Sequence, residues 1–167
     1  MEITTGMIKE LRETSGAGVM ECRSALISCG GDIEKALAKL RERGLVQAQK
    51  KAERVTGQGL VDAYIHTAGR IGAMVEVNCE TDFVARTDEF KSLAHCLAMQ
   101  VAALNPKYIS EEQVPPGEEV DPKEACLLSQ LYIRDPAITI KDLIAGTIAK
   151  TGENIRVRRF VRYELSN

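Results

Sequence analysis

Tryptophan is absent from this sequence, and aromatic residues make up only 4% of it. Proteins that bind single-stranded nucleic acid stack bases on aromatic side chains, so this shortage argues against such a surface. No stretch approaches the ~18 consecutive apolar residues that a transmembrane helix needs, and we expect no membrane partner. The N-terminus shows no basic segment followed by an apolar run, so we expect no signal peptide.

An excess of one charge is also missing. The formal net charge of −2 gives no general reason to expect nucleic acid or an acidic membrane as a partner. The five cysteines form no CxxC pair and are odd in number, which is typical of reduced thiols rather than of disulfides or a zinc site. We therefore expect a cytoplasmic protein without a metal or another cofactor. A chain of 167 residues can form one ordinary domain or two small ones.

The first 44 residues predict three short helices. Thr4 or Thr5 is expected to cap the first helix and Asp32 the third. Glycines separate the helices and end the last one, at Gly16 to Gly18, Gly30-Gly31 and Gly44. With the basic run 47–54 as a helical extension, we expect a helical domain at residues 1–54, followed by a flexible linker at 56–59.

The second of these helices raises a question about Met20. Its inward side is expected to carry Val19, Cys22, Leu26 and Cys29, which turns Met20 partly outward beside Gly16-Ala17-Gly18. An exposed methionine suits an adaptable contact surface, but Met20 can equally fill a gap in the core. The basic run 47–54 favours a solvated helix face over a phosphate-binding patch, because it has neither glycine-rich spacing nor aromatics.

Residues 55–167 predict an α+β core of antiparallel strands with helices packed on one side. Val61, Ala63 and Ile65 alternate with polar residues and predict a half-buried strand, and a second strand follows at 71–77. A long helix then ends at Asn105-Pro106. Its expected apolar face consists of Phe90, Leu93, Leu97, Val101 and Leu104.

The rest of the core is predicted to contain two helices and a strand. Residues 106–122 are rich in proline and acidic groups and predict a surface connection. A short helix is expected to carry Leu127, Leu128 and Leu131, and a capping box of Thr139 and Asp142 begins the next helix. In the strand at 154–163, Ile155, Val157, Val161 and Tyr163 are expected to share a face, although Arg159 and Phe160 interrupt the alternation.

Between the second strand and the long helix lies a short polar loop that contains Asp82 and Phe83. Loops face water, where a large aromatic rarely lies without a partner or a core to enter. Phe83 therefore has two interpretations. It either packs beneath the following helix, which is the commoner fate of a phenylalanine, or it projects toward another molecule.

Three segments carry a resemblance to a known family. The segment Glu76-Val-Asn-Cys-Glu-Thr-Asp-Phe-Val-Ala-Arg86 resembles the signature of elongation factor Ts, the nucleotide exchange factor for the translational GTPase elongation factor Tu. Segments 11–22 and 152–160 resemble the family's N-terminal and C-terminal motifs. The chain departs from the family pattern at Val19, where methionine is common, and at Arg23, where lysine is common.

The resemblance implies two contact sites and a homodimer. The N-terminal bundle resembles a ubiquitin-associated domain that docks on the GTPase, and Arg12, Val19 and Met20 match its contact positions. Asp82 and Phe83, flanked by Thr81 and Val84, resemble the wedge that the family inserts near the partner's magnesium and phosphate site. Members with one core, as here, are expected to dimerise through it.

Other functions compete with exchange-factor activity. Several carboxylates near the loop could serve acid–base catalysis, namely Glu76, Glu80, Asp82, Asp88 and Glu89. No nucleophile, metal cluster or phosphate loop accompanies them, so we expect that the protein is not an enzyme. A protein-interaction adaptor built on the helical bundle is the stronger alternative. An RNA-binding translation protein ranks third, and strongly salt-dependent RNA binding would favour it.

Overall fold

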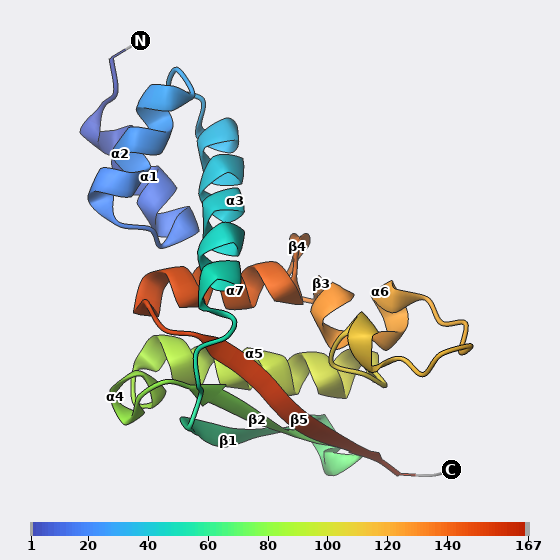
Figure 1. Cartoon of the computed structure of the whole chain (residues 1–167). Coiled ribbons are helices and arrows are strands. Elements are labelled where there is room, and N and C mark those ends of the chain that lie inside the picture. Colours follow the sequence, from blue (N-terminus) through green and yellow to red (C-terminus); the bar gives the residue numbers. More distant parts are fainter. Residues whose placement is uncertain (1, 166–167) are drawn as a thin grey trace. The chain divides into compact units, whose positions relative to one another are not determined.

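The structure is a computed structural model that describes residues 2–165. The chain divides into two compact units, one formed by residues 2–53 with 145–153 and the other by residues 54–144 with 154–165. Figure 1 labels the elements of both, and each unit is described here by itself. Within the described range, no helix is long and apolar enough to cross a membrane.

The first unit contains the three predicted helices, α1 (Thr5–Ser15), α2 (Val19–Ser28) and α3 (Ile33–Lys51). The Thr4 and Asp32 side chains accept hydrogen bonds from the backbone N–H groups of Met7 and Lys35, so both expected N-caps are confirmed. Gly16 ends α1 with a φ of 65°, a left-handed conformation that a side chain would disfavour.

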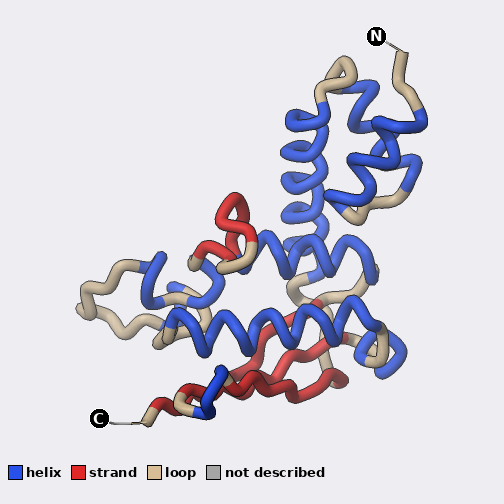
Figure 2. Tube along the Cα trace, turned by 180° about the vertical axis from the view of Figure 1, so that it is seen from behind, coloured by secondary structure: helices blue, strands red, loops and turns tan. Residues whose placement is uncertain are grey.

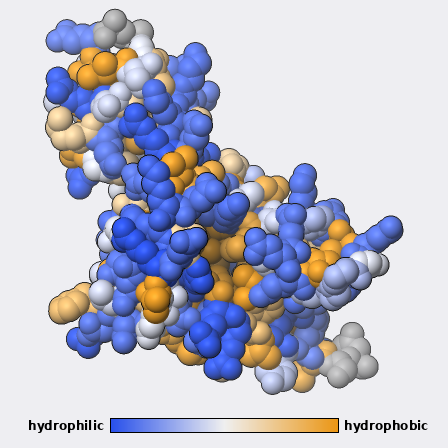
Figure 3. All heavy atoms as spheres, viewed as in Figure 1, coloured by the Kyte–Doolittle hydropathy of each residue, from blue (hydrophilic) through white to orange (hydrophobic). Residues whose placement is uncertain are grey.

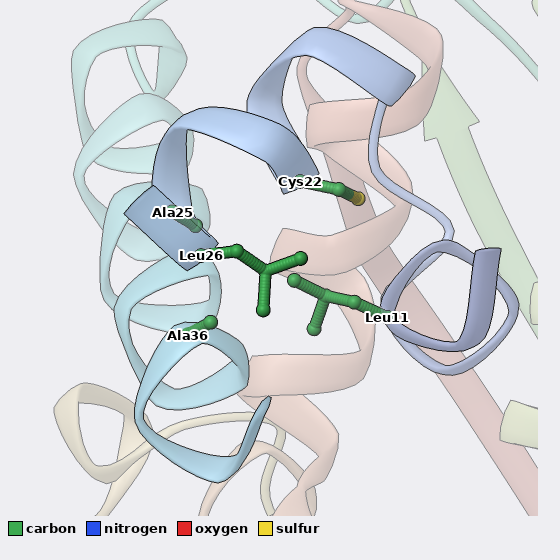
Figure 4. Packing of buried hydrophobic residues seen from close by; sticks show 5 residues of the cluster. All are labelled: Leu11, Cys22, Ala25, Leu26 and Ala36. Atoms are coloured by element: carbon green, nitrogen blue, oxygen red, sulfur yellow. The ribbon is translucent and has the colours of Figure 1, made fainter. Parts of the chain in front are cut away.

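A small apolar core joins these helices. Leu11 from α1 meets Leu26, Ala25 and Cys22 from α2 and Ala36 from α3, and all five are fully buried (Figure 4). Most of these side chains are small, so the helices approach closely but bury little apolar area per residue. A core of this size gives limited stability by itself.

The predicted end of the third helix at Gly44 is wrong. α3 continues through Gly44 to Lys51, and Gly44 is buried. A Cβ atom added at Gly44 would lie 3.7 Å from the backbone oxygen of Ala145. The missing side chain thus allows another helix to approach here, and this packing outweighs the ~1 kcal/mol cost of a mid-helix glycine.

The second unit is built on a three-stranded antiparallel sheet with the strand order β1-β2-β5. Its strands are β1 (Gln58–Ile65), β2 (Ile71–Cys79) and β5 (Ile155–Glu164). The long helix α5 (Asp88–Leu104) covers one face of this sheet, as Figures 1 and 2 show. The predicted α+β class, with antiparallel strands and helices on one side, is confirmed.

The predicted linker at 56–59 is too long, because Gln58 and Gly59 already belong to β1. A Cβ atom at Gly59 would collide with the backbone oxygen of Val77 on the neighbouring strand, and Gly59 has a φ of 152°. Glycine is therefore required here by the close approach of β2 rather than by linker flexibility.

The inward face of β1 was predicted wrongly. Val61, Ala63 and Ile65 are exposed, whereas Asp62 and Tyr64 lie on the side covered by α5. There the Asp62 carboxylate pairs with His95 of α5, with 3.3 Å between Oδ2 and Nδ1. Alternation alone gives the two faces of a strand but does not say which face is covered.

The prediction that Ile155, Val157, Val161 and Tyr163 share one face of β5 is wrong, because the strand contains a β-bulge. Val77 pairs with Val157, but Glu76 pairs with Arg159, so one extra residue lies in β5 between them. The bulge moves Val161 and Tyr163 to the exposed face, away from Ile155 and Val157. The break that Arg159 and Phe160 make in the alternation is the sequence signal of this bulge.

The face of α5 and the N-terminus of α7 were largely predicted correctly. Four of the five expected α5 residues are buried, but Leu104, in the last turn, is 46% exposed. α7 (Ile140–Thr151) begins with the predicted capping box, in which the Thr139 N–H donates to Asp142 Oδ2 and the Asp142 N–H donates to Thr139 Oγ1. A left-handed Gly152 follows its last turn.

The predicted helix with Leu127, Leu128 and Leu131 does not form. After a connection with one 3-10 turn at Glu111–Gln113, the chain makes only short pieces. They are α6 (Pro122–Ala125), a 3-10 turn (Leu127–Ser129), β3 (Leu131–Tyr132) and β4 (Asp135–Thr139). The buried Gln100 side chain donates to the Leu131 oxygen at 3.0 Å and accepts from the Ile133 N–H at 3.0 Å. These bonds fix Leu131 in β3 and Ile133 in the turn that follows it.

Replacement of Gln100 is expected to destabilise the protein. Gln100→Ala removes three hydrogen bonds, one to the buried Gln130 Oε1 and two to partly buried backbone groups, and leaves these groups without their partner. Since each such group costs roughly 1–3 kcal/mol, we expect the free energy of unfolding to fall by about 3 kcal/mol or more in chemical denaturation. The exposed Gln49→Ala on α3 is the control and should change it by less than about 0.5 kcal/mol. Equal effects of both substitutions would contradict the role of Gln100.

Candidate functional site

The loop after β2 leads into a helix of a single turn. Thr81 is extended and caps α4 (Asp82–Ala85), its Oγ1 accepting from the Val84 N–H at 3.4 Å. Ala85 is buried, whereas Phe83 lies two residues earlier and about 200° away around the helix axis. α4 therefore packs against the core through one side and presents Phe83 on the other.

Phe83 is 79% exposed. Its packing beneath the following helix, the first of the two interpretations, is therefore wrong for the free protein. Figure 3 shows hydrophobic surface projecting at the position of α4. The large aromatic that the core does bury near this loop is Phe90 in the first turn of α5, which is fully buried. An exposed phenylalanine is costly to keep in water, and its apolar surface is available to another molecule.

Asp82, beside Phe83, carries a compensated charge. Its Oδ2 lies 2.8 Å from Arg86 Nη2, an i,i+4 ion pair across the end of the helix. A carboxylate in the first turn is also favoured by the helix dipole. Both side chains of the pair are largely exposed, so the ion pair is weak and can be exchanged for a partner's groups.

The backbone on both sides of α4 is held by side chains. The buried Cys79 thiol donates to the Thr81 oxygen at 3.1 Å. After α4, Thr87 Oγ1 donates to the Val84 oxygen at 2.8 Å and accepts from the Phe90 N–H at 3.2 Å. The two ends of the turn are thus fixed to β2 and to α5.

The residues expected for N-terminal docking are all exposed. Met20 is 68% and Val19 49% exposed, and Arg12 is also exposed, on α1. The inward placement of Val19 is wrong, because the buried cluster on α2 begins one turn later, at Cys22. The interpretation in which Met20 fills a gap in the core is also wrong, because Met20 is exposed. Two adjacent apolar side chains at the start of α2 therefore face solvent.

The environment of Glu76, one of the carboxylates near the loop, does not resemble that of a general acid. Glu76 is held by Arg159 and Arg158, with 2.7 Å between Glu76 Oε2 and Arg159 Nε. Partial burial acts to raise the pKa of Glu76, but hydrogen bonds from Arg159 and Asn78 bring that pKa below its ordinary value. A general acid needs the opposite shift. Within residues 2–165, no three or more His, Cys, Asp or Glu side chains form a group that could hold a metal ion.

Comparison with known proteins identifies the family. The family model described as elongation factor TS matches residues 24–121. The elongation factor Ts of Thermoanaerobacter sp. (strain X514) is 53% identical over 97% of this chain and 94% of its own length. Those of Heliobacterium modesticaldum and Thermotoga neapolitana are 50% and 49% identical, over 98% and 99% of this chain and 90% and 98% of their own lengths.

The comparison also shows a difference in length. The alignment with the Thermoanaerobacter protein extends over 192 positions, and this chain has 167 residues, so the relative carries at least 25 residues that are missing here. The similarity nevertheless includes both units and all three motifs. The chain therefore belongs to the elongation factor Ts family.

Proposed function

We propose that this protein binds elongation factor Tu in its GDP form and promotes GDP release, so that GTP can bind. The observation that supports this most directly is the exposed Phe83 on a helix of one turn within the family signature. A role in translation also implies a cytoplasmic location. The protein performs no covalent chemistry in this proposal and needs no cofactor of its own.

The exchange wedge consists of Thr81, Asp82, Phe83 and Val84. A GTPase holds its nucleotide largely through magnesium and backbone groups around the phosphates. A wedge that displaces the elements around this site weakens nucleotide binding. By thermodynamic reciprocity, the nucleotide weakens binding of the exchange factor by the same factor.

The energetics require contacts beyond the wedge. Each tenfold in GDP release needs about 1.4 kcal/mol of differential binding. Burial of one aromatic side chain supplies roughly 1.5–3 kcal/mol, which corresponds to only about ten- to a hundredfold. Docking surfaces elsewhere must therefore contribute to the complex.

We assign the docking surface to the N-terminal helices. Arg12, Val19 and Met20 are its contact residues, and the bundle is proposed to act as a ubiquitin-associated-like domain at residues 1–54. Residues 55–167 are proposed as the core domain, which carries the wedge, and within them residues 145–153 belong to the compact unit of the N-terminal helices. Methionine and arginine are both enriched at protein-binding surfaces.

The test is release of fluorescent GDP from elongation factor Tu, measured with and without saturating protein. We expect the release rate to rise. Binding without a change in the release rate would instead support the adaptor function, and absence of binding would overturn both.

We further propose that the protein forms a homodimer through the core. The sheet face opposite α5 exposes Val61, Ile65, Met74, Val161 and Tyr163. At the end of the sheet near the β1–β2 turn, Ile65, Met74, Val161 and Tyr163 line a shallow cavity of about 310 Å³. An exposed apolar sheet face of this kind favours pairing with a second copy around a two-fold axis.

A charge in the middle of this face is expected to prevent dimerisation. Met74→Glu places a carboxylate on the central strand, where a second copy would have to bury it without a partner. Sedimentation velocity at tens of micromolar should show a dimer for the unmodified protein and a monomer for Met74→Glu. Leu104→Glu, at a site of similar exposure on α5, is the control and should remain dimeric. A monomeric unmodified protein would contradict the proposal.

A further inference from the structure

The C-terminal motif contains a buried residue that contacts the loop before the wedge. Asn154 is 2% exposed, and its backbone N–H donates to Glu80 Oε1 at 2.7 Å. Its side-chain Nδ2 donates to the Arg54 oxygen at 2.9 Å. The Arg54 guanidinium lies 3.5 Å from the same Glu80 oxygen. We call these three residues the Glu80 anchor.

The Glu80 anchor joins parts of the chain that are far apart in sequence. Asn154 directly precedes β5, and it lies 74 residues from Glu80 and 100 residues from Arg54. Only about a quarter of the Glu80 side chain is exposed, so its bonds are partly shielded from water. A charged acceptor with a short N–H···O bond gives a stronger contact than a neutral pair.

The position of Glu80 gives the anchor its importance. Glu80 directly precedes Thr81, the cap of α4, and Phe83 follows three residues later. α4 has only four residues, which is too short for a helix to persist through its own hydrogen bonds. The orientation of Phe83 must therefore be maintained by contacts from outside the helix.

We propose that Glu80 and Asn154 are positioning residues that hold the exchange wedge in its binding orientation. This inference rests on the proposed function. A wedge that is ordered before it meets its partner does not lose conformational entropy on binding. Small errors of position at a reacting or binding group can cost up to about a hundredfold in rate. The anchor thus links the family's C-terminal motif to the wedge, although the wedge lies outside that motif.

The first test uses three variants in the GDP release assay, at several protein concentrations. Glu80→Ala removes the acceptor for the Asn154 N–H and should lower the maximal release rate by roughly ten- to a hundredfold. The concentration for half-maximal effect should change little, because the docking residues are intact. Glu80→Gln keeps an oxygen acceptor and should recover most of the rate. Glu119→Ala, an exposed glutamate of the core, is the matched control.

The second test measures the free protein, without elongation factor Tu. The N–H groups of Val84 and Ala85 both donate to Thr81, so their hydrogen exchange reports the order of α4. Exchange at these two amides should accelerate in Glu80→Ala and stay unchanged in Glu119→Ala. Glu80→Ala should also have no further effect on the rate in a Phe83→Ala background, since the anchor acts through Phe83.

Two results would overturn the inference. One is unchanged amide exchange in α4 on loss of the Glu80 side chain. The other is an equal fall in release rate with Phe83 present or absent, which would indicate a general structural role. If the unmodified protein fails to accelerate GDP release, the proposed function is wrong, and the amide-exchange measurement still tests the anchor by itself.

Discussion

Phe83→Ala is expected to slow stimulated GDP release from elongation factor Tu by roughly ten- to a hundredfold, the contribution of one buried aromatic contact. Because Phe83 is 79% exposed, its removal empties no site in the free protein. The free energy of unfolding should therefore change by less than about 0.5 kcal/mol. Stopped-flow release of fluorescent GDP and thermal melting, on the same preparation, measure the two effects.

The control for this result is Phe90→Ala. Phe90 is fully buried, seven residues further along the chain, and its truncation should cost about 3–5 kcal/mol of stability. The folded fraction of this variant should still stimulate release, because the wedge is unchanged. A large fall in melting temperature for Phe83→Ala, with the exchange rate preserved in the folded protein, would contradict the wedge.

Asp82→Ala should act in the same direction as Phe83→Ala. An anionic group near magnesium competes with the phosphates that the metal helps to hold. In the free protein this charge is paired with Arg86, at a surface where the pair contributes little stability. We therefore expect slower GDP release with an unchanged melting temperature. If Asp82→Ala stimulates GDP release as strongly as the unmodified protein does, Asp82 does not contribute and Phe83 alone acts in the wedge.

The second large effect is expected at the docking surface. Met20→Asp places a charge where an exposed methionine is proposed to contact the GTPase. Loss of a central apolar contact costs roughly 2–4 kcal/mol, so the half-maximal concentration should rise by at least about thirtyfold. The maximal release rate should change little, because the wedge is intact. A titration of release rate against protein concentration separates the two quantities.

A comparable change on another surface is the control for Met20. Val46→Asp alters an exposed apolar residue of α3 and should leave the half-maximal concentration unchanged. Point variants suit this test better than removal of residues 1–54, because residues 145–153, which include the last part of α7, belong to the same unit as the N-terminal helices. A Met20→Asp protein with unimpaired affinity would remove Met20 from the docking surface.

Local sequence signals predicted the elements of the fold well. Caps at Thr4, Asp32 and Thr139 lie where the residue types indicated, because capping depends on neighbours within three residues. The strands β1 and β2 and most of the α5 face also follow from short-range periodicity. These features need no knowledge of what packs against them.

The errors occur where distant segments decide the outcome. α5 covers the polar side of β1, so Val61 and Ile65 face outward despite being apolar. Gly44 remains helical because another helix passes close to it. Gln100 bonds to the backbone of Leu131 and Ile133 from 31 and 33 positions away, which fixes a short strand and turn where a helix was expected. None of these contacts leaves a local pattern.

The sequence predicted the position of the site in the chain, but it did not predict the geometry of the site. The signature singled out Thr81 to Val84, yet burial statistics for phenylalanine left the direction of Phe83 open. The structure shows its exposure, which follows from the one-turn helix that buries Ala85 instead. The contact between Glu80 and Asn154 joins two motifs that sequence reasoning treated separately.

The central claim, that this protein is an exchange factor for elongation factor Tu, is tested most directly by a release assay in which the protein is present in much smaller amount than elongation factor Tu. Elongation factor Tu loaded with fluorescent GDP is mixed with excess unlabelled nucleotide and about one hundredth of an equivalent of this protein. An exchange factor is released when new nucleotide binds, through the same reciprocity that drives GDP off, and acts again. We expect the whole population of labelled GDP to be released at an accelerated rate. Acceleration limited to the one hundredth that can be bound at once would contradict an exchange function.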